Sequence, residues 1–208
     1  MRHLVSAVSE LRKSGVKKLV DARMNELTAN FSSEAKVFSE LCFCLLTANE
    51  RAAKGMEIQE KIGNGFLKLP EGRLVAFLKS HGYRFYNVRA RYIIGARRHY
   101  GKLRGALSLL KNDEERREWL VENVLGLGYK EASHLLRNLG FNHVAILDRH
   151  IIHIMHGHGM IGELPKTLNK KTYLENEKRL APLCARLGIA QGELDFYLWY
   201  METGKVLK

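Results

Sequence analysis

The sequence predicts an all-α fold, and three features carry that prediction. Helix-forming residues fill most segments, and only three prolines occur in 208 residues. Apolar residues recur at helical spacing, for example at Val16, Val20 and Met24. Hydrophobic residues make up 46% of the chain, which is enough to bury a core. We therefore expect one large helical domain, or two small helical subdomains, rather than strands or disorder.

Three helices are expected at the start of the chain. Residues 1–13 and 16–30 are predicted to form two amphipathic helices. The Ser-Ser-Glu segment at 32–34 can cap a third helix. Its run from Val37 to Leu46 is apolar on nearly all sides, which predicts a helix at the centre of the fold. This helix ends in the polar sequence 47–50.

Residues 51–111 are predicted to form short helices separated by glycines. Basic and aromatic side chains interleave between Tyr83 and Tyr100. Such a mixture suits contacts with the phosphates and bases of a nucleic acid. A helix with a solvated basic face and a buried aromatic face would show the same pattern, so both interpretations stand. The stretch contains Arg84, Phe85, Tyr86, Arg89, Arg91, Tyr92, Arg97, Arg98 and His99.

Four further helices are expected in the second half. One covers 113–125, and the next follows a glycine-containing turn and stops at Gly140. Asp148 is placed to cap a helix that starts near Arg149. The last helix spans about 191–202. In the first of the four, the side chains expected to face inward are Trp119, Leu120, Val124 and Leu125.

The formal net charge is +12, from 34 Lys and Arg against 22 Asp and Glu. Such an excess predicts a polyanionic partner, with nucleic acid first and an anionic membrane surface second. A solubilising or heat-tolerant surface is the alternative. No apolar window of about 18 residues occurs, so no membrane span is expected. Residues 1–13 lack the apolar core of a signal peptide, so a cytoplasmic location is expected.

Metal ligation has weak support in the sequence. The cysteines Cys42, Cys44 and Cys184 lack CxxC spacing and are expected to be core residues, not ligands of zinc or an iron–sulfur cluster. Histidines spaced three apart follow Asp148, and no carboxylate or cysteine completes a familiar ligand pattern with them. A polar helix face is favoured over a metal site here. These histidines are His150, His153, His156 and His158.

The segment 124–132, Val-Leu-Gly-Leu-Gly-Tyr-Lys-Glu-Ala, is the strongest local signal. Glycines at 126 and 128 allow backbone angles that other residues resist, and they let a phosphate approach the main chain. The N–H groups at the start of the next helix would face that phosphate. Gly126 and Gly128 are therefore predicted to bind DNA without reading bases. A plain helix–turn–helix corner is the alternative.

Lys130 and Asp148 form the candidate catalytic pair. Lys130 starts the second helix of the hairpin, and Asp148 follows 18 residues later, after one helix and one short connection. A helix N-terminus and partial burial both favour the uncharged amine, which is a nucleophile. A carboxylate beside it can orient the amine and stabilise positive charge on a sugar intermediate. Taken alone, Lys130 could instead be a phosphate-binding or surface lysine, and Asp148 a plain N-cap.

These residues resemble the helix-hairpin-helix motif of the DNA glycosylase superfamily that includes endonuclease III. Lys130 matches the lysine of its bifunctional members, and Asp148 matches its aspartate. The stretch before Asn49 is similar to the superfamily's helix end, which implies that Asn49 fills the space left by a flipped base. The lack of a cysteine cluster argues against endonuclease III itself.

The whole chain is more similar to the archaeal-type, or second, family of 8-oxoguanine DNA glycosylase/AP lyases. This resemblance implies that Lys208, at the C-terminus, helps to separate 8-oxoguanine from guanine. Trp199 and Phe85 are candidates to stack on an extruded base. From the residues alone, Trp199 is more often a core residue, whereas Phe85 fits either role equally. Without the resemblance, the tail at 205–208 would be expected to fray.

The predicted protein is thus a single catalytic unit over 1–208, with two helical subdomains flanking a DNA-binding cleft. The suggested subdomains are 51–148, which holds the hairpin, and 1–50 with 149–208. The expected activity is excision of 8-oxoguanine and β-elimination through a lysine Schiff base, without metal or other cofactor. The expected partner of this monomer is double-stranded DNA containing oxidised guanine, with the protein nucleoid-associated when bound. A monofunctional glycosylase and a non-catalytic DNA-binding protein are the alternatives.

Overall fold

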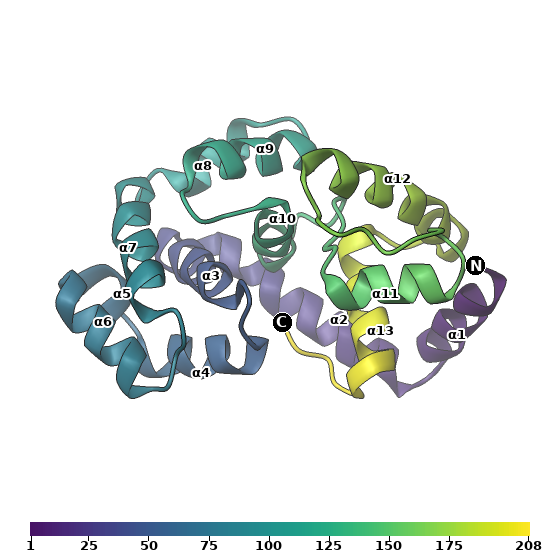
Figure 1. Ribbon diagram of the computed structural model, residues 1–208, viewed down its shortest axis with the longest axis horizontal. Helices are drawn as coiled ribbons and strands as arrows, with labels where there is room; N and C mark the ends of the chain where they lie inside the picture. The colour runs from purple at the N-terminus through teal and green to yellow at the C-terminus, as the bar shows by residue number, and fades with distance from the viewer. The chain divides into compact units, whose positions relative to one another are not determined.

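The computed structural model describes all 208 residues, and it consists of helices and loops without a strand (Figure 1). The all-α prediction is confirmed. The chain forms two compact units, residues 30–135 and residues 1–29 with 136–208. The sequence had suggested 51–148 for the first of these units. The DNA-binding cleft stays a prediction. No helix combines the length and the apolar character that crossing a membrane requires.

The 30–135 unit is built around α3 (Glu34–Thr47), as its apolar run predicted. Ten of its 14 residues are buried, and the Ser33 hydroxyl caps it by accepting from the backbone N–H of Lys36. Helices α4, α7 and α8 pack against it. The other elements of this unit are α4 (Ala52–Ile62), α5 (Gly65–Lys68), α6 (Glu71–Ser80), α7 (Tyr86–Ala96), the 3-10 turn η2 (Arg97–His99), α8 (Leu103–Leu109) and α9 (Asp113–Asn123). The 3-10 turn η1 (Ala29–Ser32) leads into α3, and α10 (Tyr129–Asn138) leaves the unit.

The inward face of α9 differs from the predicted one. Leu120 and Val124 are buried, but Leu125 is 69% exposed. The helix ends at Asn123, so Leu125 lies on the following loop, where the helical period no longer decides its direction. Arg117, which was not expected to face inward, is buried. Its Cζ lies 5.2 Å from the centroid of the Tyr129 ring.

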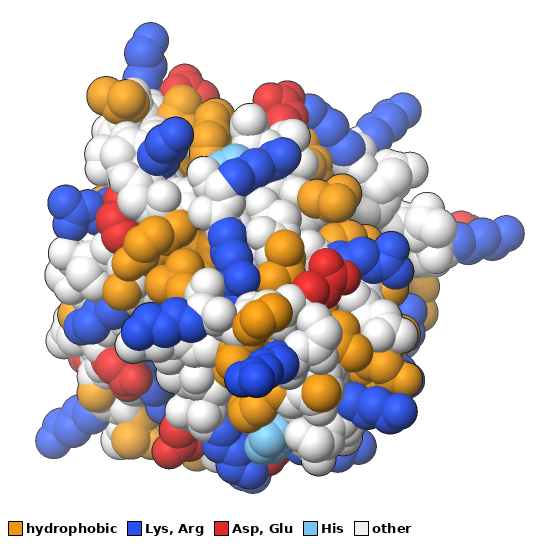
Figure 2. Space-filling model, turned by 90° about the vertical axis from the view of Figure 1, so that its left-hand side faces the viewer, with side chains coloured by type: hydrophobic (Ala, Val, Ile, Leu, Met, Phe, Trp, Pro, Cys, Tyr) orange, Lys and Arg blue, Asp and Glu red, His pale blue; other side chains and the backbone are white.

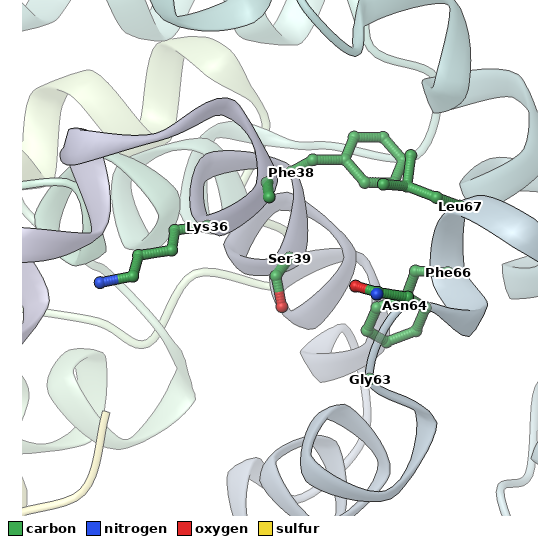
Figure 3. A pocket seen from close by; sticks show the side chains of 8 residues that line it. Lys36, Phe38, Ser39, Gly63, Asn64, Phe66 and Leu67 are labelled. Atoms are coloured by element: carbon green, nitrogen blue, oxygen red, sulfur yellow. The ribbon is translucent and has the colours of Figure 1, made fainter.

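A small hollow of about 250 Å³ lies between α3 and α5 in this unit. Phe38 and Phe66 supply its apolar wall, and Ser39 and Asn64 supply polar atoms (Figure 3). The side chain of Lys36 extends away from the others in this view. The hollow therefore has no charged group directed into it.

The other unit packs α13 (Gln191–Thr203) against α1 (Arg2–Lys13), α2 (Gly15–Thr28), α11 (Arg149–Gly157) and α12 (Lys170–Leu187). The predicted end of α13 is confirmed, because Gly204 adopts a left-handed conformation with φ 67°. The sequence patterns did not predict α12. This 18-residue helix continues through Pro182, a residue that usually ends helices.

Part of the connection from Gly140 to Asp148 is buried although it is not helical. Residues 144–147 are at most 5% exposed, so their backbone polar groups need partners inside the protein. Two side chains of α12 supply them. The Glu177 carboxylate accepts from the N–H of Ala145 at 2.7 Å. The Tyr173 hydroxyl donates to the Ala145 carbonyl at 2.7 Å and accepts from the N–H of Leu147 at 3.1 Å.

Replacing Tyr173 with Phe should therefore destabilise the protein. The ring remains, but the Ala145 carbonyl and the Leu147 N–H each lose a buried partner, which costs about 1–3 kcal/mol of the free energy of unfolding. Urea unfolding followed by circular dichroism measures this change. Tyr100→Phe is the matched control, because Tyr100 is 41% exposed and its change should stay within about 0.5 kcal/mol. Equal stability of the two variants would contradict the assigned role of Tyr173.

Candidate active site and DNA-binding residues

The hairpin loop lies between α9 and α10, as predicted. Gly126 has φ 96°, in the left-handed region that favours glycine. The ring of Tyr92, on α7, covers its Cα so closely that a Cβ at Gly126 would lie 2.3 Å from Tyr92 Cδ2. Gly126 therefore combines an unusual backbone angle with a close side-chain contact. No sequence pattern indicated this contact, because the two residues are 34 positions apart.

Gly128 does not have the unusual backbone angle expected of it. Its φ is not positive, so the expected unusual backbone angle occurs at Gly126 only. Its Cα instead lies under the carboxylate of Glu131, and a Cβ would lie 3.2 Å from Glu131 Oε2. The Gly128 carbonyl accepts from the N–H of Ala132 at 2.9 Å, in the first turn of α10. The close contact at Gly128 is thus with the end of a flexible side chain, and its φ does not require glycine.

Lys130 is the second residue of α10, directly after the hairpin. Its side chain is 24% exposed, and its Nζ lies 3.8 Å from Glu131 Oε1. The lysine is therefore partly buried, as predicted, and still accessible. Glu131 was not among the predicted site residues, because a single carboxylate in a first helical turn is an ordinary feature of helices.

Asp148 caps α11, and this prediction is confirmed. Its carboxylate accepts from the backbone N–H of Ile151 at 2.9 Å, at the start of the helix. Asp148 belongs to the unit 1–29 with 136–208, whereas Lys130 belongs to the unit 30–135. The pairing of their side chains stays a prediction. The cap uses one carboxylate oxygen, so the group can serve a second purpose.

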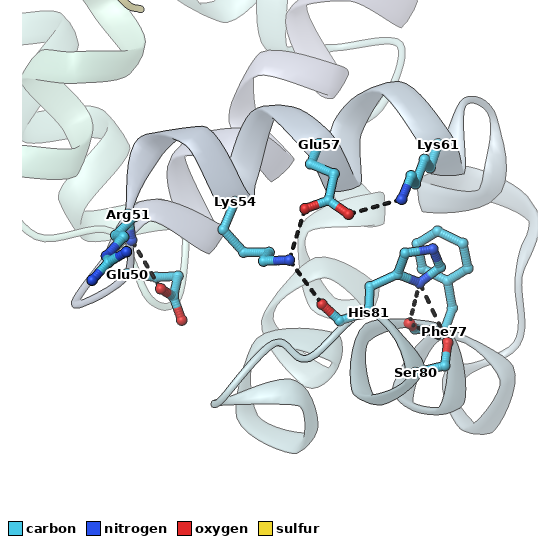
Figure 4. Close-up of polar contacts among 8 residues, drawn as sticks. All are labelled: Glu50, Arg51, Lys54, Glu57, Lys61, Phe77, Ser80 and His81. Atoms are coloured by element: carbon cyan, nitrogen blue, oxygen red, sulfur yellow. Dashed lines mark hydrogen bonds and ion pairs between the residues drawn. The ribbon is translucent and has the colours of Figure 1, made fainter.

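Asn49 lies on a tight turn after α3. It is exposed and has φ 60°, and it is the only residue other than glycine with positive φ. Asparagine tolerates this conformation better than most residues. The Glu50 carboxylate accepts from the N–H of Arg51 at 3.0 Å directly after the turn (Figure 4). The turn thus directs the Asn49 side chain into solvent, as a gap-filling residue requires.

One stretch of the 30–135 unit is basic and free of acidic residues. Residues 72–112 contain ten Lys and Arg and no Asp or Glu. The side of the molecule with α5 and α6 carries many Lys and Arg side chains and few acidic ones (Figure 2). On neighbouring α4, hydrogen bonds from Lys54 and Lys61 lower the pKa of Glu57 to about 2 (Figure 4). This surface suits contact with a polyanion.

The predicted base-contacting residues occur in both units. Phe85 is half-buried at the start of α7, and the Arg84 guanidinium lies 4.5 Å from its ring centroid. Trp199 is half-buried on α13, and its Nε1 is buried without a hydrogen-bond partner. Lys208 is half-buried at the end of the chain. No single helix places these three residues, so their assembly around a base stays a prediction.

The histidines after Asp148 do not gather into a metal site with other ligands. No group of three His, Cys, Asp or Glu side chains is placed to hold an ion. His150 instead contacts Trp199, with ring centroids 5.2 Å apart and planes at 88°. Edge-to-face contacts of this kind favour one ring orientation.

Comparison with known proteins assigns a family. A family model described as 8-oxoguanine DNA glycosylase matches residues 20–189. The 8-oxoguanine DNA glycosylase/AP lyase of Methanocaldococcus jannaschii is 45% identical over 207 residues, which are 99% of each chain. The relative from Korarchaeum cryptofilum is 46% identical over 205 residues, which are 99% of this chain and 98% of the relative.

Solved structures agree with this assignment. The M. jannaschii 8-oxoguanine glycosylase/lyase in complex with a 15mer DNA containing 8-oxoguanine has a TM-score of 0.95 and 44% identity. The similarity covers 99% of this chain and 100% of that one. The 8-oxoguanine DNA glycosylase of Thermotoga maritima has a TM-score of 0.93 and 39% identity, over 100% and 99% of the two chains. The predicted helix-hairpin-helix glycosylase fold is confirmed.

Gly126→Ala should destabilise the hairpin. The new Cβ would overlap the Tyr92 ring, and φ 96° would be strained for alanine. We expect a loss of about 1–3 kcal/mol in the free energy of unfolding, measured by urea titration. Gly95→Ala is the matched control, because Gly95 lies in α7 and no atom lies within 4 Å of the position its Cβ would take. That variant should gain about 0.5–1 kcal/mol. A stable Gly126→Ala protein would refute the close contact.

Proposed function

Because the chain belongs to the 8-oxoguanine DNA glycosylase family, we propose that it removes 8-oxoguanine from DNA and cleaves the strand at the resulting abasic site. One observation carries this proposal. The chain matches 8-oxoguanine DNA glycosylase/AP lyases over 99% of its length and over nearly all of theirs. Its hairpin, its exposed Asn49 turn and its acid-free basic stretch suit the DNA substrate.

Lys130 is the proposed nucleophile. Its position directly after the hairpin and its partly exposed amine support this role. The uncharged amine attacks C1′ of the damaged nucleotide, and the bond from C1′ to the base breaks. The lysine–sugar Schiff base then acidifies the C2′ proton. Loss of that proton expels the 3′ phosphate, so the strand is cut on the 3′ side of the lesion.

Asp148 is the proposed partner carboxylate. As the base departs, positive charge develops on the sugar, and a fixed carboxylate stabilises it. Its hydrogen bond to the N–H of Ile151 restricts the side chain at the start of α11. The same group can help to move protons during the steps at Lys130. This chemistry requires no metal or organic cofactor.

Recognition of the damaged base is assigned to Phe85, Trp199 and Lys208. An extruded base can stack on either aromatic ring. 8-Oxoguanine differs from guanine by an N7–H donor and an 8-oxo group. The terminal carboxylate of Lys208 can accept that N7–H, whereas the unprotonated N7 of guanine would repel it. The edge contact of His150 supports an ordered Trp199 ring.

The remaining residues hold the duplex. Gly126 and Gly128 are the proposed hairpin contacts with the duplex backbone, and the free N–H groups at the N-terminus of α10 would face a phosphate. Asn49 fills the space left by the flipped base. The partner is double-stranded DNA with oxidised guanine, and one copy of the chain supplies every residue that the mechanism uses.

Lys130→Gln should abolish base release and the adduct that borohydride traps between protein and DNA. Binding to a duplex with 8-oxoguanine should remain largely intact, because the hairpin backbone is unchanged. Gel analysis of borohydride-treated reactions and a binding titration measure both properties. Lys18→Gln is the matched control, because it removes an equal charge from an exposed position on α2.

Three outcomes distinguish the alternatives. An adduct from the Lys130→Gln protein would exclude Lys130 as the nucleophile. Base release by the unmodified protein without any adduct would indicate a monofunctional glycosylase. Damaged duplex that stays intact after long incubation with the unmodified protein would indicate a DNA-binding protein without catalysis.

Asp148→Asn should separate capping from catalysis. Asparagine caps helices about as well as aspartate, so the free energy of unfolding should change by less than about 1 kcal/mol. Loss of the charge should slow base excision at least about a hundredfold in single-turnover assays. Ser33→Ala is the converse control, because it removes the cap of α3 and costs about 1 kcal/mol while the excision rate persists. An Asp148→Asn enzyme of normal rate would limit Asp148 to capping.

A further inference from the structure

We propose that Arg89 and Tyr92 are positioning residues that hold the Asn49 turn at a fixed distance from the hairpin. Neither residue needs to touch the reacting atoms. The inference rests on the proposed function, in which Asn49 fills the gap in the duplex and the hairpin holds its backbone. It adds a connection between these two DNA-contacting parts of the 30–135 unit.

The end of α3 is held by three side chains from one short segment. The Tyr83 hydroxyl donates to the Leu46 carbonyl at 2.6 Å. The Arg84 guanidinium donates to the Asn49 carbonyl at 2.8 Å, and that of Arg89 donates to the Ala48 carbonyl at 3.1 Å. The first bond satisfies a carbonyl that the helix leaves unpaired in its last turn, and the other two pair carbonyls of the turn that follows the helix. They also hold Asn49 in its left-handed conformation.

Arg89 connects this turn to a second residue of α7. Its Nε is buried without a hydrogen-bond partner, so the turn alone does not satisfy the guanidinium. Its Cζ lies 5.4 Å from the centroid of the Tyr92 ring. Residues three apart share one face of a helix, and a cation beside an aromatic ring is attracted to it. Arg89 is therefore held between the Ala48 carbonyl and Tyr92.

Tyr92 completes the connection at the hairpin. Its ring covers Gly126, where no Cβ could fit. The contacts thus form a continuous path from the Asn49 turn through Arg89 and Tyr92 to Gly126. All four lie in one compact unit, and the two middle residues lie on the same helix. The path fixes the spacing between the gap-filling side chain and the loop that holds phosphate.

This spacing matters most when a base must leave the duplex. Extrusion of a paired base costs a few kcal/mol, which a preformed gap-filling geometry helps to offset. An abasic site has no base to extrude, so its cleavage depends less on this geometry. Loss of the path should therefore slow excision of 8-oxoguanine more than cleavage at a preformed abasic site. A general loss of folding or affinity would slow both.

Arg89→Met tests the proposal, with Arg91→Met as its matched control. Arg91 is exposed on the same helix and its replacement removes the same charge. Single-turnover rates are measured on a duplex with 8-oxoguanine and on one with an abasic site. For Arg89→Met we expect about tenfold slower excision and less than about threefold slower cleavage. For Arg91→Met, the ratio of the two rates should equal that of the unmodified protein.

Four further variants keep the proposal falsifiable. Arg89→Lys retains a donor and a cation and should restore most of the excision rate. Tyr92→Phe retains the ring and should behave as the unmodified protein, whereas Tyr92→Leu should behave as Arg89→Met. If the two residues act along one path, the Arg89→Met, Tyr92→Leu double variant should lose no more than the worse single variant.

The inference is overturned if Arg89→Met and Arg91→Met have the same ratio of excision rate to abasic-site cleavage rate. It is also overturned if the losses in excision rate of the two single variants multiply in the double variant. It is also overturned if Tyr92→Phe is as slow as Tyr92→Leu. Failure of the proposed function gives a different result, because the unmodified protein would then fail to excise 8-oxoguanine. Urea unfolding of each variant identifies any that do not fold. If Arg89→Met does not fold, the ratio of the two rates is read from Tyr92→Leu.

Discussion

Burial of α3 is the constraint on which the 30–135 unit depends. A helix that is apolar on nearly all sides must be covered on all sides, and α4, α7 and α8 cover it. The Leu46 carbonyl in its last turn and the Ala48 and Asn49 carbonyls just after it have side-chain donors. Tyr83, Arg84 and Arg89 supply them, and burial raises the pKa of Tyr83 to about 12, which keeps its hydroxyl protonated. The same donors shape the turn that exposes Asn49. Burial of α3 therefore also determines the position of this proposed DNA-contacting residue.

The other unit meets a similar requirement by different means. Its buried connection before Asp148 has no helical hydrogen bonds, so Tyr173 and Glu177 on α12 pair with its backbone. These bonds hold the end of the connection, where Asp148 begins α11. A proposed catalytic carboxylate is thus placed by a helix that contributes nothing to the chemistry. Supporting residues of this kind restrict a reactive group without contacting substrate.

The predictions failed where a side chain's role depended on the exact end of a helix or on packing. Leu125 was expected inside, but α9 ends before it and the loop turns it outward. Gly128 was expected to need an unusual φ, but its φ is not positive, and the atom nearest to a Cβ there would be Oε2 of the flexible Glu131 side chain. The sequence did not predict α12 because Pro182 lies inside it, and proline usually ends a helix. Packing of a long helix can outweigh the one hydrogen bond that proline removes. Tyr92 was recognised only as one member of a basic and aromatic stretch.

The sequence by itself determined what depends on neighbours within a few residues. These features include the helical class, the caps at Ser33 and Asp148, the glycine stop at Gly204, and the place of Lys130 after the hairpin. Only the tertiary structure decided that Tyr92 covers Gly126 and that Arg89 holds the Ala48 carbonyl. These partners are 34 and 41 positions apart. Periodicity and capping describe local hydrogen bonding, whereas such contacts arise only when packing of a shared core brings distant segments together.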